Sequence, residues 1–178
     1  MSSNFFNHFL ENDKTDIDIF QGATILVVDD HQDMLLVMTE LFESYGIQVL
    51  RASNALTGLE VIKQYAVDLL ISDITMPLND GYWLIQKIRS LEYSQTREIP
   101  AIAFTGNTED KADKKALASG FQAYIQKPST ATELITEVAK LLKSRKYTLC
   151  QGEYLQEAKC DLCFGFLNIS IPDFTLLW

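Results

Sequence analysis

The sequence predicts an α/β fold in which a doubly wound, five-stranded parallel sheet has helices on both faces. Between residues 23 and 144, five short apolar runs alternate with five longer segments of helical spacing. Short, mostly uncharged runs are typical of parallel strands that are covered on both faces. Strands that alternate with helices imply right-handed crossover connections.

The expected strands are residues 23–28, 48–52, 68–72, 99–104 and 122–126. The first three helices are indicated by apolar residues three or four positions apart. These stripes are Leu35, Met38, Phe42 and Tyr45, then Leu59, Ile62 and Ala66, then Leu84, Ile88 and Leu91. A glycine, Gly46, ends the first helix.

The fourth expected helix is short and charged and ends at Gly120. The fifth, over residues 129–144, opens on Ser or Thr caps and carries an apolar stripe. This pattern predicts one domain at residues 23–144, preceded by an N-terminal extension (1–22) and followed by an apolar C-terminal tail (145–178).

Composition excludes several classes of protein. The formal net charge of −9 disfavours direct DNA binding, because phosphate contacts need a basic surface. The sequence has no apolar run of the length that spans a membrane and no signal-peptide pattern, so we expect no membrane span. The 3 cysteines do not form a disulfide framework for the main body, which favours a cytoplasmic location.

Polar residues follow four of the predicted strands. Asp29 and Asp30 follow the first, Asp73 the third, Thr105 the fourth and Lys127 the fifth. The carboxyl ends of parallel strands meet at one edge of a sheet, where ligand sites form. Taken singly, the aspartate pair could cap a helix, Asp73 could be a turn residue and Lys127 a surface charge. Their coincidence on four strands favours a shared site.

Three carboxylates at one edge repel one another. Two unit charges about 4 Å apart repel by about 4 kcal/mol at an effective dielectric constant near 20. One lysine cannot neutralise three carboxylates, but a divalent ion with oxygen ligands such as Mg²⁺ can. A metal ion beside a lysine also suits phosphoryl transfer. Asp73 is therefore a candidate nucleophile that would form an acyl phosphate.

These motifs resemble those of a known family. The strand-one "VVDD", the strand-three "SDITMP" with its following "DG", the strand-four "FTG" and the strand-five "YIQKP" resemble the receiver domain of two-component response regulators. The resemblance covers about two-thirds of the chain. It implies the flavodoxin-like (βα)5 fold and a phosphorelay signalling protein that promotes its own phosphorylation and dephosphorylation, rather than an enzyme with an external substrate.

The resemblance also implies roles for the acidic residues. Asp73 would be the phosphoacceptor, and its donor would be a histidine kinase or a histidine phosphotransfer protein. Asp30 would bind Mg²⁺ directly and Asp29 mainly through water. The backbone carbonyl of Thr75 would be a further metal ligand. Thr75 and Asn107 would occupy positions that tune dephosphorylation.

The same resemblance implies a switch. Lys127 would contact the phosphoryl oxygens, and Pro128 would follow it through a cis peptide bond. Thr105 would hydrogen-bond the phosphoryl group, and Tyr124 would turn inward in step with it. The face formed by the fourth helix, the fifth strand and the fifth helix would then report the phosphorylated state to a downstream protein target.

His31 departs from the family pattern, in which acidic or amide residues are common at this position. We expect it to begin the following helix and to point to solvent. A role as a pH-sensitive neighbour of the metal is the alternative, because histidine titrates near neutral pH.

A second class of function stays open on these residues. An Mg²⁺-dependent phosphohydrolase could use Asp73 as nucleophile on an external phosphate. Thr75 stands where haloacid-dehalogenase-like phosphatases have a second aspartate, and there is no cap insertion, so this alternative is disfavoured.

The C-terminal tail resembles no output domain. Its 34 residues are too few for a helix-turn-helix domain. Cys150, Cys160 and Cys163 give either half of a zinc site, a redox pair or incidental thiols, of which incidental thiols are favoured. The apolar end, residues 164–178, is expected to pack on its own domain or to form a homodimer contact.

Overall fold

The computed structural model describes residues 19–106 and 111–153. Contacts divide the chain into two units, Met1–Arg145 and Lys146–Trp178, and the fold below is that of the first. Within the described residues, no helix combines the length and the apolar character that crossing a membrane requires. The predicted domain boundaries at residues 23 and 144 stay predictions.

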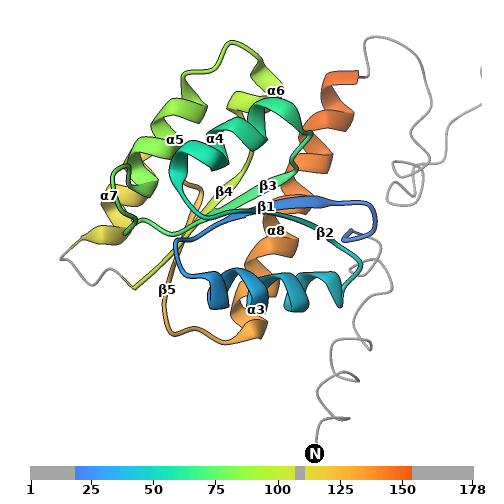
Figure 1. Ribbon diagram of the computed structural model, residues 1–178. Helices are drawn as coiled ribbons and strands as arrows, with labels where there is room; N and C mark the ends of the chain where they lie inside the picture. The colour runs from blue at the N-terminus through green and yellow to red at the C-terminus, as the bar shows by residue number, and fades with distance from the viewer. Residues whose placement is uncertain (1–18, 107–110, 154–178) are drawn as a thin grey trace, which may run out of the picture. The chain divides into compact units, whose positions relative to one another are not determined.

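Five parallel strands form a single sheet in the order β2-β1-β3-β4-β5 (Figure 1). In chain order the elements are β1 (Thr24–Val28), α3 (Gln32–Glu43), β2 (Gln48–Ala52), α4 (Ala55–Gln64), β3 (Leu69–Ser72), α5 (Gly81–Arg89), α6 (Ser94–Arg97), β4 (Ala101–Thr105), α7 (Ala112–Ser119), β5 (Ala123–Gln126) and α8 (Ala131–Glu153). The predicted doubly wound α/β fold is confirmed, and the strand order reverses between β1 and β3.

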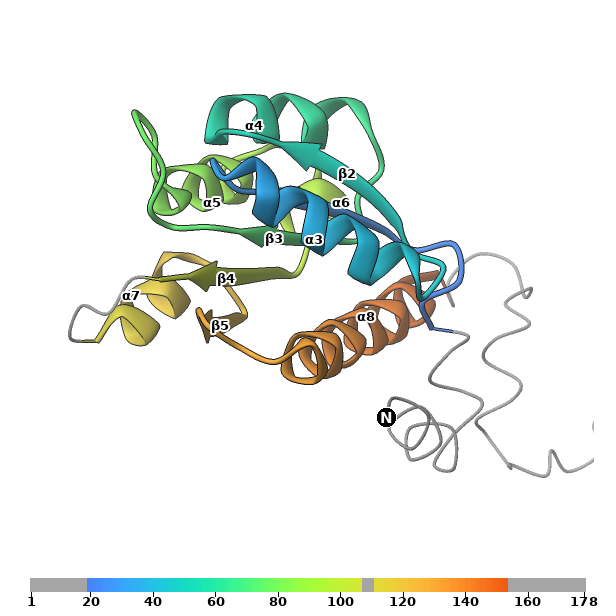
Figure 2. The same ribbon diagram turned by 60° about the horizontal axis from the view of Figure 1, so that its bottom comes forward.

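Helices α3 and α8 cover one face of the sheet, and α4, α5 and α7 cover the other (Figures 1 and 2). Successive side chains along a strand point to opposite faces of the sheet, so the core consists of two clusters, one on each face. Ile25 and Val27 belong to the cluster that contains Phe42 of α3, whereas Leu26 and Val28 belong to the cluster that contains Leu84 of α5. A strand that is buried on both faces reads as a continuous apolar run, which is why these strands were visible in the sequence.

Several details of the helices differ from the sequence prediction, including Tyr45, which lies beyond the end of α3 at Glu43. Ala66 is not part of the second helix: α4 ends at Gln64, Tyr65 is extended, and Ala66 is exposed on the way to β3. Leu91 lies beyond the end of α5 but still packs against the core, partly buried. The four-residue helix α6 was too short to produce an apolar stripe, and α8 continues to Glu153, past the predicted end at residue 144.

The register of the sheet brings the polar strand ends together. Val28 of β1 pairs with Ser72 of β3, so Asp29 and Asp73 leave neighbouring strands side by side. The amide of Asp73 donates a hydrogen bond of 2.8 Å to the carbonyl of Val28. On the other side, the amide of Lys127 donates to the carbonyl of Thr105, also at 2.8 Å. Parallel pairing therefore places residues that are up to 98 positions apart at one edge.

Candidate functional site

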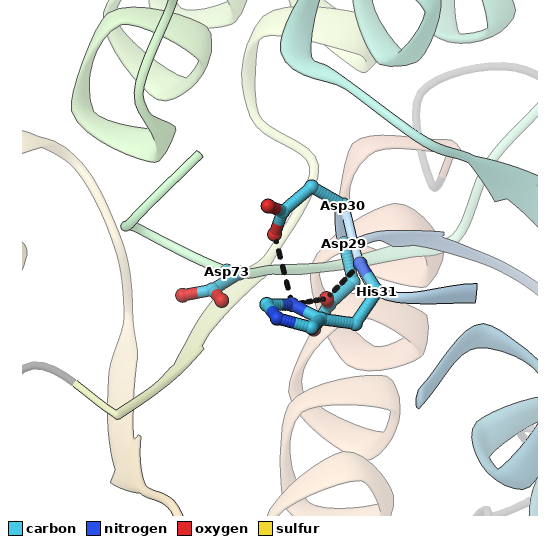
Figure 3. A group of neighbouring side chains, drawn as sticks. All are labelled: Asp29, Asp30, His31 and Asp73. Atoms are coloured by element: carbon cyan, nitrogen blue, oxygen red, sulfur yellow. Dashed lines mark hydrogen bonds and ion pairs between the residues drawn. The ribbon is translucent and has the colours of Figure 1, made fainter. Parts of the chain in front are cut away.

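Two loops at the carboxyl edge of the sheet supply a cluster of possible metal ligands. Asp29, Asp30 and His31 follow β1, and Asp73 follows β3 (Figure 3). One side-chain ligand atom from each of these four residues lies within 4.8 Å of the others. The sequence predicted the three carboxylates at this edge, and the structure brings them together.

Lys127 joins two of the carboxylates. Its Nζ lies 2.5 Å from Oδ2 of Asp29 and 3.3 Å from Oδ2 of Asp73. The side chains of Asp29 and Asp73 are only 3% and 6% exposed, so the ammonium group offsets charge that is almost fully removed from water. Nζ also lies 5.1 Å from the ring centroid of Phe104, a cation–π contact. The sequence did not reveal this contact, because Phe104 reads as an ordinary core residue of its strand.

Asp73 is held by the loop between β3 and α5. Its Oδ1 accepts a hydrogen bond of 3.0 Å from the amide of Thr75, which leaves Oδ2 facing Lys127. At the far end of the loop, Asp80 caps α5 by accepting a 2.7 Å hydrogen bond from the amide of Trp83. The Thr75 amide contact and the cap fix both ends of the loop between β3 and α5.

Position 81, which follows the cap residue, has no room for a side chain. A Cβ atom built at this position would lie 2.3 Å from the carbonyl oxygen of Asp73 and 2.8 Å from Cα of Ile74. The Gly81 amide also donates a 2.9 Å hydrogen bond to the carbonyl of Ile74. The first turn of α5 therefore packs directly on the backbone of the candidate nucleophile, which any larger residue would prevent.

His31 begins α3, as predicted, but its ring does not simply point to solvent. It is the N-cap residue and makes no capping hydrogen bond, and its side chain is 73% exposed. Its Nδ1 nevertheless lies 3.2 Å from Oδ1 of Asp29 and 3.1 Å from Oδ1 of Asp30 (Figure 3). This inward contact agrees with the alternative position, next to the metal site, for which the only signal in the sequence was that His31 follows the aspartate pair.

The donor atoms fit a divalent cation. Oδ1 of Asp30 is buried and accepts no hydrogen bond in the part of the chain that the structure describes, although Nδ1 of His31 lies 3.1 Å from it. A buried carboxylate oxygen without a donor is costly unless a cation neutralises it. Carboxylate oxygens are the ligands that Mg²⁺ prefers. Thr75, whose backbone carbonyl is the further predicted ligand, lies in the same loop as Asp73.

Of the remaining predicted residues, Thr105 lies on β4, Tyr124 on β5, and Pro128 just beyond the end of β5. Thr105 is fully buried at the carboxyl end of β4, and the Lys127–Pro128 peptide bond is cis. Tyr124 of β5 is half-buried, and this burial, together with the charge of Asp113, raises its pKa. Asn107 lies outside the described residues.

Tyr124 lines a surface groove of about 320 Å³ between α7, β5 and α8. Asp113, Glu133 and Glu137 give this groove an acidic lining. The groove lies on the face that the family resemblance links to output.

Comparison with known proteins identifies the family. A family model for the response regulator receiver domain matches residues 25–139. The chain belongs to this receiver family. An uncharacterized 14.6 kDa protein of Leptolyngbya boryana is 39% identical over 111 residues, which cover 62% of this chain and 83% of that protein. The sensor histidine kinase RcsC of Salmonella typhi is 34% identical over 68% of this receiver chain, which spans only 12% of the kinase.

Solved structures agree with this assignment. A response regulator receiver domain protein from Clostridium thermocellum superimposes with a TM-score of 0.65 at 27% sequence identity, over 71% of this chain and 98% of that one. Receiver domains are signalling domains that occur both in response regulators and within histidine kinases.

The predictions for the cysteines and the apolar tail stay predictions. Cys150 lies in α8, but its side chain is outside the described part of the chain, as are Cys160, Cys163 and the apolar tail.

Proposed function

We propose that this receiver accepts a phosphoryl group on Asp73 from the phosphohistidine of a histidine kinase or a histidine phosphotransfer protein, and that phosphorylation switches its association with a downstream protein target or with itself. The observation that carries the proposal is the position of Asp73. Its carboxylate is 6% exposed, contacts the ammonium group of Lys127 and lies within 4.8 Å of the other acidic ligand atoms. A carboxylate nucleophile that lies beside a lysine and beside carboxylates able to bind a cation is suited to phosphoryl transfer.

Asp30, Asp73 and the carbonyl of Thr75 would hold Mg²⁺, with Asp29 acting through water. When bound, Mg²⁺ supplies positive charge that offsets the charge of the phosphoryl oxygens. Oδ1 of Asp30, which is buried and accepts no hydrogen bond among the described residues, supports this ligand set. Oδ2 of Asp29 already accepts a hydrogen bond from Lys127, which supports binding of the metal by Asp29 through water rather than directly.

Phosphorylation forms one bond and breaks one bond. An oxygen of the Asp73 carboxylate attacks phosphorus while the bond between phosphorus and the donor imidazole nitrogen breaks, and the electron pair stays on that nitrogen. Lys127, 3.3 Å from Oδ2 of Asp73, is placed to donate to the phosphoryl oxygens. In dephosphorylation, water attacks phosphorus, the bond to the Asp73 oxygen breaks, and inorganic phosphate leaves.

Thr105 and Tyr124 would transmit the change. Thr105 ends β4 beside Lys127, to which its carbonyl is hydrogen-bonded, so its hydroxyl can follow a newly placed phosphoryl group. Tyr124 lies three residues before Lys127 on β5 and lines the acidic groove. A rearrangement of these two side chains would change the groove and hence what binds there.

The test is intact mass after incubation with acetyl phosphate and Mg²⁺. Wild type and an Asp80→Asn control, which keeps a good N-cap residue in the same loop, should gain one phosphoryl group. Asp73→Asn should gain none. Size-exclusion chromatography of the same samples would detect phosphorylation-dependent self-association.

Three results would count against the proposal. Equal phosphorylation of Asp73→Asn would show that another residue is the acceptor. Sustained turnover of a generic phosphate ester by wild type, lost in Asp73→Asn, would favour the phosphohydrolase instead. If wild type gains no mass, failure to form a stable beryllofluoride adduct would refute phosphorylation at this site.

A further inference from the structure

We infer that His31 is a nitrogen ligand of the metal site and shifts its preference from Mg²⁺ toward a later first-row divalent ion such as Co²⁺ or Zn²⁺. The inference rests on the proposed metal site and concerns which ion occupies it. Its basis is the donor set, since the four side chains that converge here are three aspartates and one histidine.

The contacts of the ring place its Nδ1 among the carboxylates. Although 73% of the side chain is exposed, Nδ1 lies 3.1–3.2 Å from one oxygen each of Asp29 and Asp30. Among the described residues, these two aspartates are the only hydrogen-bond and ion-pair partners of the imidazole. An exposed ring that makes no capping bond is thus held over the candidate ligands by those ligands alone.

The spacing matches that of ligands on one ion. Adjacent ligands of an octahedral ion with bonds of about 2.1 Å stand about 3.0 Å apart, and those of a tetrahedral ion stand about 3.4 Å apart. The separations of 3.2 and 3.1 Å from Nδ1 to the two carboxylate oxygens fall within this range. The 3.1 Å between Nδ1 of His31 and Oδ1 of Asp30 therefore suits two ligands of one cation, beside which Asp29 would act through water.

Lys127 does not block this arrangement. Its ammonium group contacts Oδ2 of Asp29, whereas His31 faces Oδ1 of the same carboxylate. The two oxygens of Asp29 therefore point to two different partners. Oδ1 of Asp30, which accepts no hydrogen bond among the described residues, lies 3.1 Å from Nδ1 of His31. A cation and the lysine can occupy the site together.

Nitrogen changes the selectivity of such a site. Mg²⁺ prefers oxygen ligands, while imidazole suits Zn²⁺ and other later first-row ions, whose affinity for mixed nitrogen and oxygen sites rises along the series. His31 adds a nitrogen donor to a group whose other side-chain donors are carboxylate oxygens. The ratio of affinities for Co²⁺ and Mg²⁺ should therefore depend on His31.

The experiment is calorimetric titration of the full chain with Mg²⁺ and, separately, with Co²⁺. Three proteins are compared: wild type, His31→Asn, and His8→Asn, which removes the only other histidine. We expect His31→Asn to lose about tenfold or more in Co²⁺ affinity, as when partners in a metal site are removed, while Mg²⁺ affinity changes little. The visible absorption spectrum of bound Co²⁺ should change in His31→Asn and stay unchanged in His8→Asn.

The variant should fold, because asparagine is a favoured N-cap residue and His31 makes no capping bond that would be lost. An unchanged ratio of Co²⁺ to Mg²⁺ affinity would overturn the inference. So would tighter binding of both ions by His31→Asn, which would show that the imidazole N–H competes with the cation. Either of these results leaves the proposed function intact if His31→Asn is still phosphorylated with Mg²⁺. If wild type binds neither ion, the metal site itself is refuted.

Discussion

Replacing Lys127 by methionine should destabilise the fold when no divalent ion is present. Methionine keeps most of the apolar length of the side chain but removes the ammonium group that contacts Asp29 at 2.5 Å and Asp73 at 3.3 Å. Both carboxylates are almost fully buried, so water cannot take over the role of the lysine. The variant leaves two negative charges facing each other in a site of low polarity.

The size of the effect follows from the geometry. Ligand oxygens of Asp29 and Asp73 lie within 4.8 Å, which corresponds to a repulsion of about 3.5 kcal/mol at an effective dielectric constant of 20. Removing the lysine also relieves the cost of burying its own charge, which offsets part of this repulsion. We expect the free energy of unfolding to fall by about 2–4 kcal/mol, in line with broken buried ion pairs.

The assay is urea unfolding at neutral pH with a chelator present. Asp29→Asn and the double variant Asp29→Asn/Lys127→Met complete a cycle, in which the second substitution should cost far less once Asp29 is neutral. Lys140→Met is the matched control, because Lys140 is 70% exposed and pairs with Glu137 at the surface. Added Mg²⁺ should stabilise Lys127→Met more than wild type, since it replaces the lost positive charge.

A small loss would refute this reasoning. If Lys127→Met is destabilised no more than Lys140→Met, or if the loss is the same whether or not Asp29 is neutral, then repulsion between the buried carboxylates does not control stability. The lysine would then matter only for contact with the phosphoryl group.

Two further predictions concern the backbone at Asp73 and the groove. Gly81→Ala should cost about 1–3 kcal/mol in urea unfolding and weaken Mg²⁺ binding, because its Cβ would overlap the Asp73 carbonyl, whereas Gly106→Ala, with nothing within 4 Å, should be neutral. Burial raises the pKa of Tyr124 above its ordinary value of 10.0, so the stability that this neutral phenol contributes is complete below pH 10 and is lost as pH rises through the raised pKa. Tyr124→Phe should therefore lose less stability than wild type above pH 10, while the exposed Tyr65→Phe should track wild type; identical profiles for all three would contradict the assignment.

The fold and the location of the site were predictable from the sequence. Strands buried on both faces must be apolar throughout, so their ends are marked wherever a polar residue such as Asp29, Asp73 or Lys127 follows. Parallel strands align these ends, which is why residues far apart in the sequence could be assigned to one edge. The errors fell where tertiary contacts override periodicity, as at Ala66, where the chain leaves the helix to enter β3.

By itself, the sequence determined the order of elements, the strands and which residues meet at the carboxyl edge. Only the tertiary structure decided how those residues face one another: that His31 turns Nδ1 toward two carboxylates, that Phe104 lies beside Lys127, and that Gly81 packs on Asp73. The physical reason is that periodicity reports burial along one element. Side-chain direction and backbone approach depend on neighbouring elements, whose spacing is set by packing across the whole sheet.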